Sequence, residues 1–235
     1  MSIETQMINS ILRLTGNGPI SHELIKKDAT MTSESCRKLL DRLQNQGLVN
    51  VQKGFVEADG SQRVNLAMEA VRLGADIEDV SSHLQWQEFE SIAAVAFERN
   101  GYAVLKNLRF SSAGRRWEID VVGSRRPFVI CVDCKHWHHG LRPATLARIA
   151  REQTERTSAL VNALPVLAGR IKCASWSKAK VVPCILSLLS GAFKFHEGIP
   201  IVPVLQLQDF ISQLPAHANT LLHYSKTISN LDNWF

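Results

Sequence analysis

The sequence predicts an α/β protein in which a small N-terminal domain precedes a larger domain built on a mixed β-sheet flanked by helices. Helical periodicity dominates the first 80 residues, whereas strand-like apolar segments alternate with helical segments over the rest of the chain. The length of 235 residues is sufficient for two modest domains or one large one, and the change in pattern near residue 80 favours two. We therefore assign residues 1–80 and 81–235 to separate domains.

In the first domain, apolar residues at helical spacing predict helices over residues 3–14, 21–27 and 31–46. Strand-like segments follow at residues 48–56 and 63–67, joined by a turn at Ala58-Asp59-Gly60-Ser61. Residues 68–82 are expected to form a helix or an acidic linker.

In the second domain, the tetrapeptide Ser82-His-Leu-Gln85 is typical of a capping box and predicts a helix over residues 83–100. The next expected elements are strands at 102–107, 116–123 and 128–135, a helix at 141–164, strands at about 179–187 and 200–205, and a helix at 207–214. This order predicts a mixed sheet with helices on its faces.

The positive charge is concentrated in the second domain. The whole chain has a formal net charge of +5; residues 1–80 contribute −2 and residues 81–235 contribute +7. Because neutralising phosphates is the main physical use of such an excess, we expect nucleic-acid affinity to lie mainly in the second domain. Apolar runs fall short of the roughly 20 residues of a membrane-spanning helix, and the N-terminus has no secretion-signal pattern, so we expect no membrane partner and a cytoplasmic protein.

The five cysteines are expected to be reduced thiols, since they are odd in number and scattered along the chain. Cys131 and Cys134 form a C-x-x-C pair that could bind zinc together with His136, His138 or His139. Strand alternation sends the two cysteines to opposite faces, which favours a plain buried strand instead.

Three polar residues on two adjacent strands form the main candidate site. Asp120 lies on one strand, and Asp133 and Lys135 lie on the next, after a turn too short for anything but an antiparallel pair. Asp133 and Lys135 are two residues apart, so both side chains leave the same face. Two carboxylates and an ammonium group are thus expected to converge.

Such a trio is suited to phosphodiester hydrolysis. Carboxylate oxygens are ligands for Mg²⁺, which also accepts water and phosphate oxygens. The metal stabilises charge on the phosphoryl group and lowers the pKa of bound water, and a lysine can orient that water. We therefore expect a Mg²⁺ site, with Mn²⁺ as an alternative ion.

These residues resemble the PD-(D/E)xK nuclease superfamily, and within it the Mrr-like restriction endonucleases and archaeal Holliday-junction resolvases, over roughly residues 84–212. The resemblance matches a helix glutamate to Glu90, a strand aspartate to Asp120, and the (D/E)-x-K motif to Asp133-Cys134-Lys135. It implies a restriction-endonuclease-like fold and metal-dependent DNA cleavage, with Asp120, Asp133 and Glu90 as metal ligands. Asp133 stands where relatives more often carry Glu, and its shorter reach could shift the metal.

Two helical residues complete the candidate catalytic set. On a helical wheel Glu90 borders the apolar side more closely than Glu88 or Glu98, although an exposed structural glutamate is the alternative. Gln153 lies on the apolar stripe of the long helix. Related nucleases often carry a glutamine on this helix that reaches the site, and a buried structural glutamine is the equal alternative.

Arginines around these elements are candidate phosphate contacts. Arg156 flanks Gln153 on the long helix and is also a candidate contact with the DNA backbone. The candidates on the active-site hairpin and the long helix are Arg115, Arg116, Arg125, Arg126, Arg148 and Arg151. Ordinary surface charge is the alternative for each one singly.

The segment RKLLDRLQNQGLVNVQ resembles the third helix and first wing strand of winged helix-turn-helix domains, over about the first 75 residues. The resemblance implies DNA contacts from Arg37, Lys38 and Arg42. A packing or dimerisation module is the alternative, and the negative charge of this domain fits a protein partner.

The sequence thus predicts a Mg²⁺-dependent DNA endonuclease, expected to be a homodimer because two symmetric sites can cut both strands. The alternative is a non-enzymatic DNA-binding regulator in which the winged helix recognises DNA and an inactive nuclease-like domain dimerises.

Overall fold

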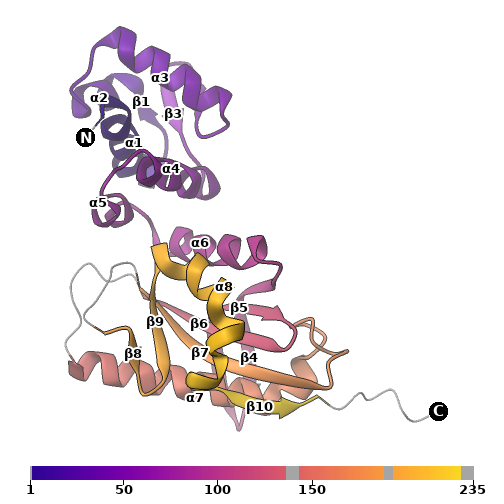
Figure 1. The fold of residues 1–235 in the computed structure, drawn as a ribbon. Helices are drawn as coiled ribbons and strands as arrows, with labels where there is room; N and C mark the ends of the chain where they lie inside the picture. Colours follow the sequence, from indigo (N-terminus) through magenta and orange to yellow (C-terminus); the bar gives the residue numbers. More distant parts are fainter. Residues whose placement is uncertain (1, 136–142, 188–192, 229–235) are drawn as a thin grey trace. The chain divides into compact units, whose positions relative to one another are not determined.

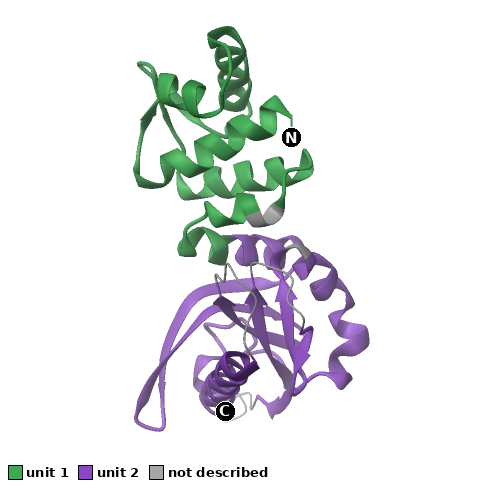
Figure 2. Cartoon of the chain, turned by 90° about the vertical axis from the view of Figure 1, so that its left-hand side faces the viewer, with its two compact units in different colours: residues 1–91 green, residues 92–235 purple. Residues whose placement is uncertain are grey.

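The computed structural model describes residues 2–135, 143–187 and 193–228. The chain forms two compact units, residues 1–91 and 92–235 (Figure 2). The division falls inside helix α6 (Trp86–Arg99). The domain boundary at residue 80 stays a prediction from sequence.

The first unit is mainly helical, with a small antiparallel sheet in the order β1-β3-β2 (Figure 1). Its helices bury apolar stripes that include Met7, Ile11 and Leu43. The elements are α1 (Ile3–Leu14), a 3-10 turn (Thr15–Asn17), β1 (Ile20–Ser21), α2 (His22–Asp28), α3 (Ser33–Asn45), β2 (Asn50–Gln52), β3 (Phe55–Glu57), α4 (Gly60–Arg72) and α5 (Ile77–Ser82).

The prediction of a strand at residues 63–67 was wrong. The hairpin is shorter and turns at Lys53-Gly54, where both residues have positive φ, of 49° and 82°. The predicted turn around Asp59 is instead a helix start. Asp59 and Gln62 form a capping box, so α4 begins at Gly60. An Asp-Gly pair is compatible with a hairpin turn and with a helix N-terminus. The capping box between Asp59 and Gln62 shows that a helix begins here.

A buried ion pair joins α4 to the start of α6 within the first unit. Arg63 and Glu88 are 3% and 4% exposed, and Arg63 Nε donates to Glu88 Oε1 at 2.6 Å. The Arg63 guanidinium also donates to the carbonyls of Leu12 and His83. Glu88 Oε2 accepts from the backbone N–H of Gln85 at 2.7 Å, so α6 begins at Trp86 and not at residue 83. The helical wheel placed Glu90 closer to the apolar side than Glu88, but the two side chains are equally buried.

Glu88→Gln is expected to lower the free energy of unfolding by about 3–5 kcal/mol, because it leaves the buried Arg63 charge uncompensated. Urea denaturation followed by circular dichroism measures this. The control is Glu34→Gln, which removes an exposed pair with Lys38 and should cost less than about 1 kcal/mol. Equal effects of the two substitutions would contradict the assigned role of Arg63 and Glu88.

The second unit is built on a seven-stranded mixed sheet in the order β4-β5-β6-β7-β9-β8, with β10 paired to β7. The first three strands are antiparallel, and β6, β7 and β9 are parallel. The elements after α6 are β4 (Ala103–Ser112), β5 (Arg115–Arg125), β6 (Phe128–Lys135), α7 (Pro143–Leu167), β7 (Lys178–Ser187), β8 (Phe195–His196), β9 (Ile199–Pro203), a 3-10 turn (Val204–Gln206), α8 (Leu207–His217), a 3-10 turn (Ala218–Thr220) and β10 (Tyr224–Thr227). The predicted α/β class with a mixed sheet core is confirmed.

Helix α7 lies along one face of this sheet (Figure 1). Its Leu160 and Leu164 share a buried cluster with Val122 of β5 and with Val129 and Cys131 of β6. Gly123, the neighbour of Val122, faces the other side, where the ring of Phe97 on α6 lies directly against it. Helix α8 is joined to the end of α6 on that side by a hydrogen bond between Gln208 and Asn100, at 3.0 Å.

Gly123→Ala is expected to destabilise the second unit by about 1–3 kcal/mol, because overpacking strains a filled core. A Cβ at this position would approach Phe97 Cδ1 to 2.7 Å. Gly169→Ala is the matched control, since nothing lies within 4 Å of its Cβ position. Thermal unfolding of both variants measures the difference, and a stable Gly123→Ala variant would contradict this packing.

Several strands differ from the predicted set. Strand β4 continues to Ser112, well past residue 107. Its second half pairs with β5 and buries Leu108 and Phe110 in the core. Strands β8 and β10 were not predicted; both are short and have no clear apolar alternation. None of the helices within the described ranges combines the length and the apolar composition that crossing a bilayer requires.

Candidate active site

The candidate site lies where β5 and β6 separate. Their ladder ends at the pair Val121–Val132, and beyond it β6 pairs only with β7. The Asp120 carboxylate bridges the gap, because its Oδ2 accepts from the backbone N–H of Cys134 at 2.8 Å. On the other side of β5 the ladder with β4 has no pair at Asp120, opposite Asn107, whose φ is 51°. A side chain thus replaces the backbone ladder at this point, next to Asp133.

Asp133 is buried, with 2% of its side chain exposed, and two cations neutralise it. Lys135 Nζ donates to Asp133 Oδ1 at 2.8 Å, as expected for residues two apart on a strand. Arg156 of α7 donates to the same oxygen. The predicted convergence of Asp133 with Lys135 is therefore present. The sequence-based prediction placed Arg156 among the DNA contacts and missed its pairing with Asp133. Arg156 is three residues from Gln153, so both side chains lie on the same side of the helix, and this spacing could have indicated the contact.

The second oxygen of Asp133 has an unusual environment. Oδ2 is buried and has no hydrogen-bond partner among the described residues. Buried carboxylate oxygens are nearly always satisfied, and one that is not needs an explanation such as an ion or a water molecule. A hard divalent cation such as Mg²⁺ prefers oxygen ligands of this kind. The donor set of Asp133 and Asp120 therefore fits such an ion, with water and phosphate as further ligands.

Glu90 is buried on α6, at 4% exposed, and belongs to the first unit, whereas Asp120 and Asp133 belong to the second. Among the described residues no group of three or more His, Cys, Asp or Glu side chains is arranged to hold a metal. The assignment of Glu90 as a catalytic residue and metal ligand stays a prediction.

Gln153 is fully buried on α7. Its Nε2 donates to the carbonyls of Cys131, at 2.6 Å, and Cys184, at 3.2 Å, so the amide ties α7 to β6 and β7. Its Oε1 is buried without a partner among the described residues. These contacts account for a polar residue in the α7 core, and its catalytic role stays a prediction.

The arginines of the hairpin lie away from Asp120 and Asp133. Arg125 and Arg126 stand at the turn, and Arg125 pairs with Phe128, five residues or about 17 Å of strand from Asp133. At the other end of β5, Arg115 stacks over Trp117 and lies 3.7 Å from Glu155 of α7. Arg116 beside it is exposed. Their DNA contacts stay predictions, and the positions fit a flanking surface better than the rim of the site.

The remaining basic candidates are also on the surface. On α7, Arg148 pairs with Glu152 at 2.6 Å, and Arg151 is exposed. On α3, Lys38 pairs with Glu34 at 2.6 Å, and Arg42 pairs with Glu4 of α1. Arg37 is exposed and lines a hollow between α2 and α3. Acidic partners thus offset part of the charge on α3.

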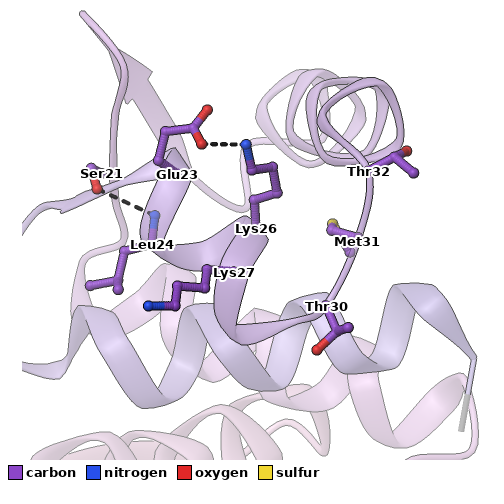
Figure 3. A pocket seen from close by; sticks show the side chains of 8 residues that line it. All are labelled: Ser21, Glu23, Leu24, Lys26, Lys27, Thr30, Met31 and Thr32. Atoms are coloured by element: carbon purple, nitrogen blue, oxygen red, sulfur yellow. Dashed lines mark hydrogen bonds and ion pairs between the residues drawn. The ribbon is translucent and has the colours of Figure 1, made fainter.

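A second hollow of the first unit lies along α2 (Figure 3). Lys26 and Glu23 form an ion pair on its wall, and the Ser21 hydroxyl accepts from the N–H of Leu24 as the helix cap. Thr30, Met31 and Thr32 close its other side. None of the predicted site residues lines it, so it is not part of the candidate site.

All five cysteines are buried and free. Burial raises the pKa of the Cys131 thiol to about 12 and that of Cys173 to about 11, so both are protonated at neutral pH. Cys131 belongs to the core under α7, and Cys134 leaves the other face of β6. The zinc alternative also needs His136, His138 or His139, which lie outside the described residues.

Native protein at pH 8 is expected to react slowly with a thiol reagent such as dithionitrobenzoate. The reason is that buried thiols with raised pKa values supply almost no accessible thiolate. In denaturing urea all five cysteines should react at once. Fast labelling of the folded protein would contradict the burial of these cysteines.

Comparison with known proteins shows which protein family the chain resembles. Residues 81–169 match the model of the Mrr_cat family, described as a restriction endonuclease. An uncharacterised protein of Archaeoglobus fulgidus is 30% identical over 135 residues, which cover 56% of this chain and 92% of that protein. The chain belongs to the same family as this archaeal protein. The Mrr_cat match covers α6, β4, β5, β6 and all of α7, and it supports a nuclease-type function.

Two solved structures are also similar. One is a protein of unknown function, AF1548, with 17% identity, a TM-score of 0.27, and coverage of 42% of this chain and 46% of that one. The other is protein VC1899 from Vibrio cholerae, with 13% identity, a TM-score of 0.40, and coverage of 92% and 51%. The chain spans about half the length of each. TM-scores this low establish no shared fold.

Proposed function

We propose that the chain is a Mg²⁺-dependent endonuclease that hydrolyses phosphodiester bonds of DNA, with Mn²⁺ as an alternative ion. The observation that carries the proposal is the hydrogen bond from the Cys134 N–H to Asp120, which places Asp120 beside the strand position of Asp133, together with a buried Asp133 oxygen that has no hydrogen-bond partner among the described residues. The Mrr_cat match to residues 81–169 supports it.

Each residue of the site has a distinct part in this reaction. Asp133 and Asp120 would hold the ion, which supplies charge stabilisation at the phosphoryl group and a more acidic bound water. Lys135, with 21% of its side chain exposed, can reach both Asp133 and solvent, and it orients the attacking water or offsets phosphoryl charge. Glu90 is proposed as a further ligand, and Gln153 holds β6 in place for Asp133.

DNA is the proposed substrate because the +7 charge of residues 81–235 suits a polyanion. A homodimer is proposed because two symmetric sites allow cleavage of both strands. The first unit is proposed as a winged-helix module. Its acidic residues offset Lys38 and Arg42 of α3, which supports a protein partner for this unit alongside DNA.

The proposed activity predicts that purified protein cuts plasmid, linear duplex or four-way-junction DNA in Mg²⁺ and not in EDTA. Asp133→Asn and Lys135→Ala are each expected to lower the cleavage rate by about 10²-fold or more, because charge stabilisation is lost. Gel assays with each substrate measure the rate and distinguish a restriction-type enzyme from a junction resolvase.

Asp120→Asn is a conservative variant of the third residue of the proposed site, after Asp133 and Lys135. An asparagine carbonyl can still accept from the Cys134 N–H, so the fold is retained while the ligand charge is lost. Lys178→Ala, at the start of β7, is an exposed control that should cut at the wild-type rate. The catalytic proposal is lost if the wild-type protein cuts none of the three substrates. It is also lost if the Asp133 and Lys135 variants cut DNA as fast as the wild-type protein does.

A further inference from the structure

We propose that Arg156 is an internal stand-in for the metal: its guanidinium neutralises Asp133 in the metal-free protein and moves to the scissile phosphate when the divalent cation binds. The inference rests on the proposed function and adds a residue to that site. It starts from one contact, the ion pair between Arg156 on α7 and Asp133 on β6.

The contact is built into the core of the second unit. Asp133 has 2% of its side chain exposed, so a lone charge there would be strongly unfavourable. Lys135 and Arg156 both bind Oδ1 and leave Oδ2 unpaired. Two cations therefore share one oxygen, while the other remains available to a ligand.

Arg156 is the cation that comes from a different element than Asp133. Lys135 is tied to the same strand as Asp133, whereas Arg156 reaches across from α7 with 25% of its side chain exposed. The neighbouring acidic residues of α7 are already paired, Glu152 with Arg148 and Glu155 with Arg115. Asp133 is thus the ion-pair partner of Arg156 within the described ranges.

Charge balance predicts what a divalent cation does here. Asp120 and Asp133 are matched by Lys135 and Arg156, so adding an ion of charge +2 leaves an excess positive charge around Asp133. Repulsion between unit charges a few ångströms apart is large in a partly buried site. The guanidinium then favours an incoming phosphate, whose geometry it matches with two parallel hydrogen bonds.

The test is a titration of the full chain with MnCl₂ in the absence of DNA, followed by calorimetry. Arg156→Gln is expected to bind Mn²⁺ on the order of tenfold more tightly than the wild type, because a competing unit charge is gone. A purely structural Arg156 predicts the reverse, since Asp133 would lose its support. Arg156→Lys keeps the charge and should bind Mn²⁺ like the wild type.

Arg170→Gln is the matched control, because Arg170 is exposed beyond the end of α7 and its guanidinium contacts only the Arg109 carbonyl, at 3.4 Å, among the described residues. Its Mn²⁺ affinity should not change. Thermal unfolding gives a second readout: Arg156→Gln should melt below the wild type in EDTA and gain more than the wild type on adding Mn²⁺. Its DNA cleavage in Mn²⁺ should be slower by about 10²-fold, since the phosphate contact is lost.

The outcomes separate this inference from the proposed function. If the wild type binds Mn²⁺ and cuts DNA, but folded Arg156→Gln binds Mn²⁺ equally or more weakly, the inference is overturned and the nuclease stands. If the wild type binds Mn²⁺ without cutting DNA, the nuclease proposal fails and the Mn²⁺ comparison still decides the role of Arg156. A wild type that binds no Mn²⁺ overturns both.

Discussion

The burial of Asp133 is the constraint on which the site depends. A carboxylate with 2% of its side chain exposed must be matched by cations. Lys135 supplies one from the same strand, and Arg156 supplies the other from α7. The position of α7 on the sheet is therefore coupled to the chemistry of the site, because the helix that covers the core also carries the counter-ion.

The packing beneath this pair explains how it stays aligned. Leu160 and Leu164 of α7 share a cluster with Cys131 of β6, and Gln153 donates to the carbonyls of Cys131 and Cys184. The hydrogen bonds of Gln153 and the apolar cluster thus hold α7 against the same part of the sheet. Residues held between two rigid elements keep their geometry better than residues on loops, which suits the proposed ion site.

The candidate site lies at the point where β5 and β6 separate. Backbone ladders normally satisfy strand N–H and carbonyl groups, and a carboxylate side chain does so here at Asp120. The same residue thus satisfies a backbone N–H and presents a negative charge beside Asp133. Buried arginine serves a different purpose in the first unit, where Arg63 and Glu88 satisfy helix ends and join α4 to α6.

The sequence by itself determined the α/β class, the strands that carry Asp120 and Asp133, and the shared face of Asp133 and Lys135, because alternation and short turns are local properties. It wrongly predicted a strand at residues 63–67. The preceding Asp59-Gly60 pair is compatible with either a turn or the start of a helix, and in the structure it starts α4. Only the tertiary structure decided that Arg156 pairs with Asp133, that Glu88 is buried, and that β10 joins β7. These are contacts between residues distant in sequence, and no local pattern specifies which partner a buried charge will find.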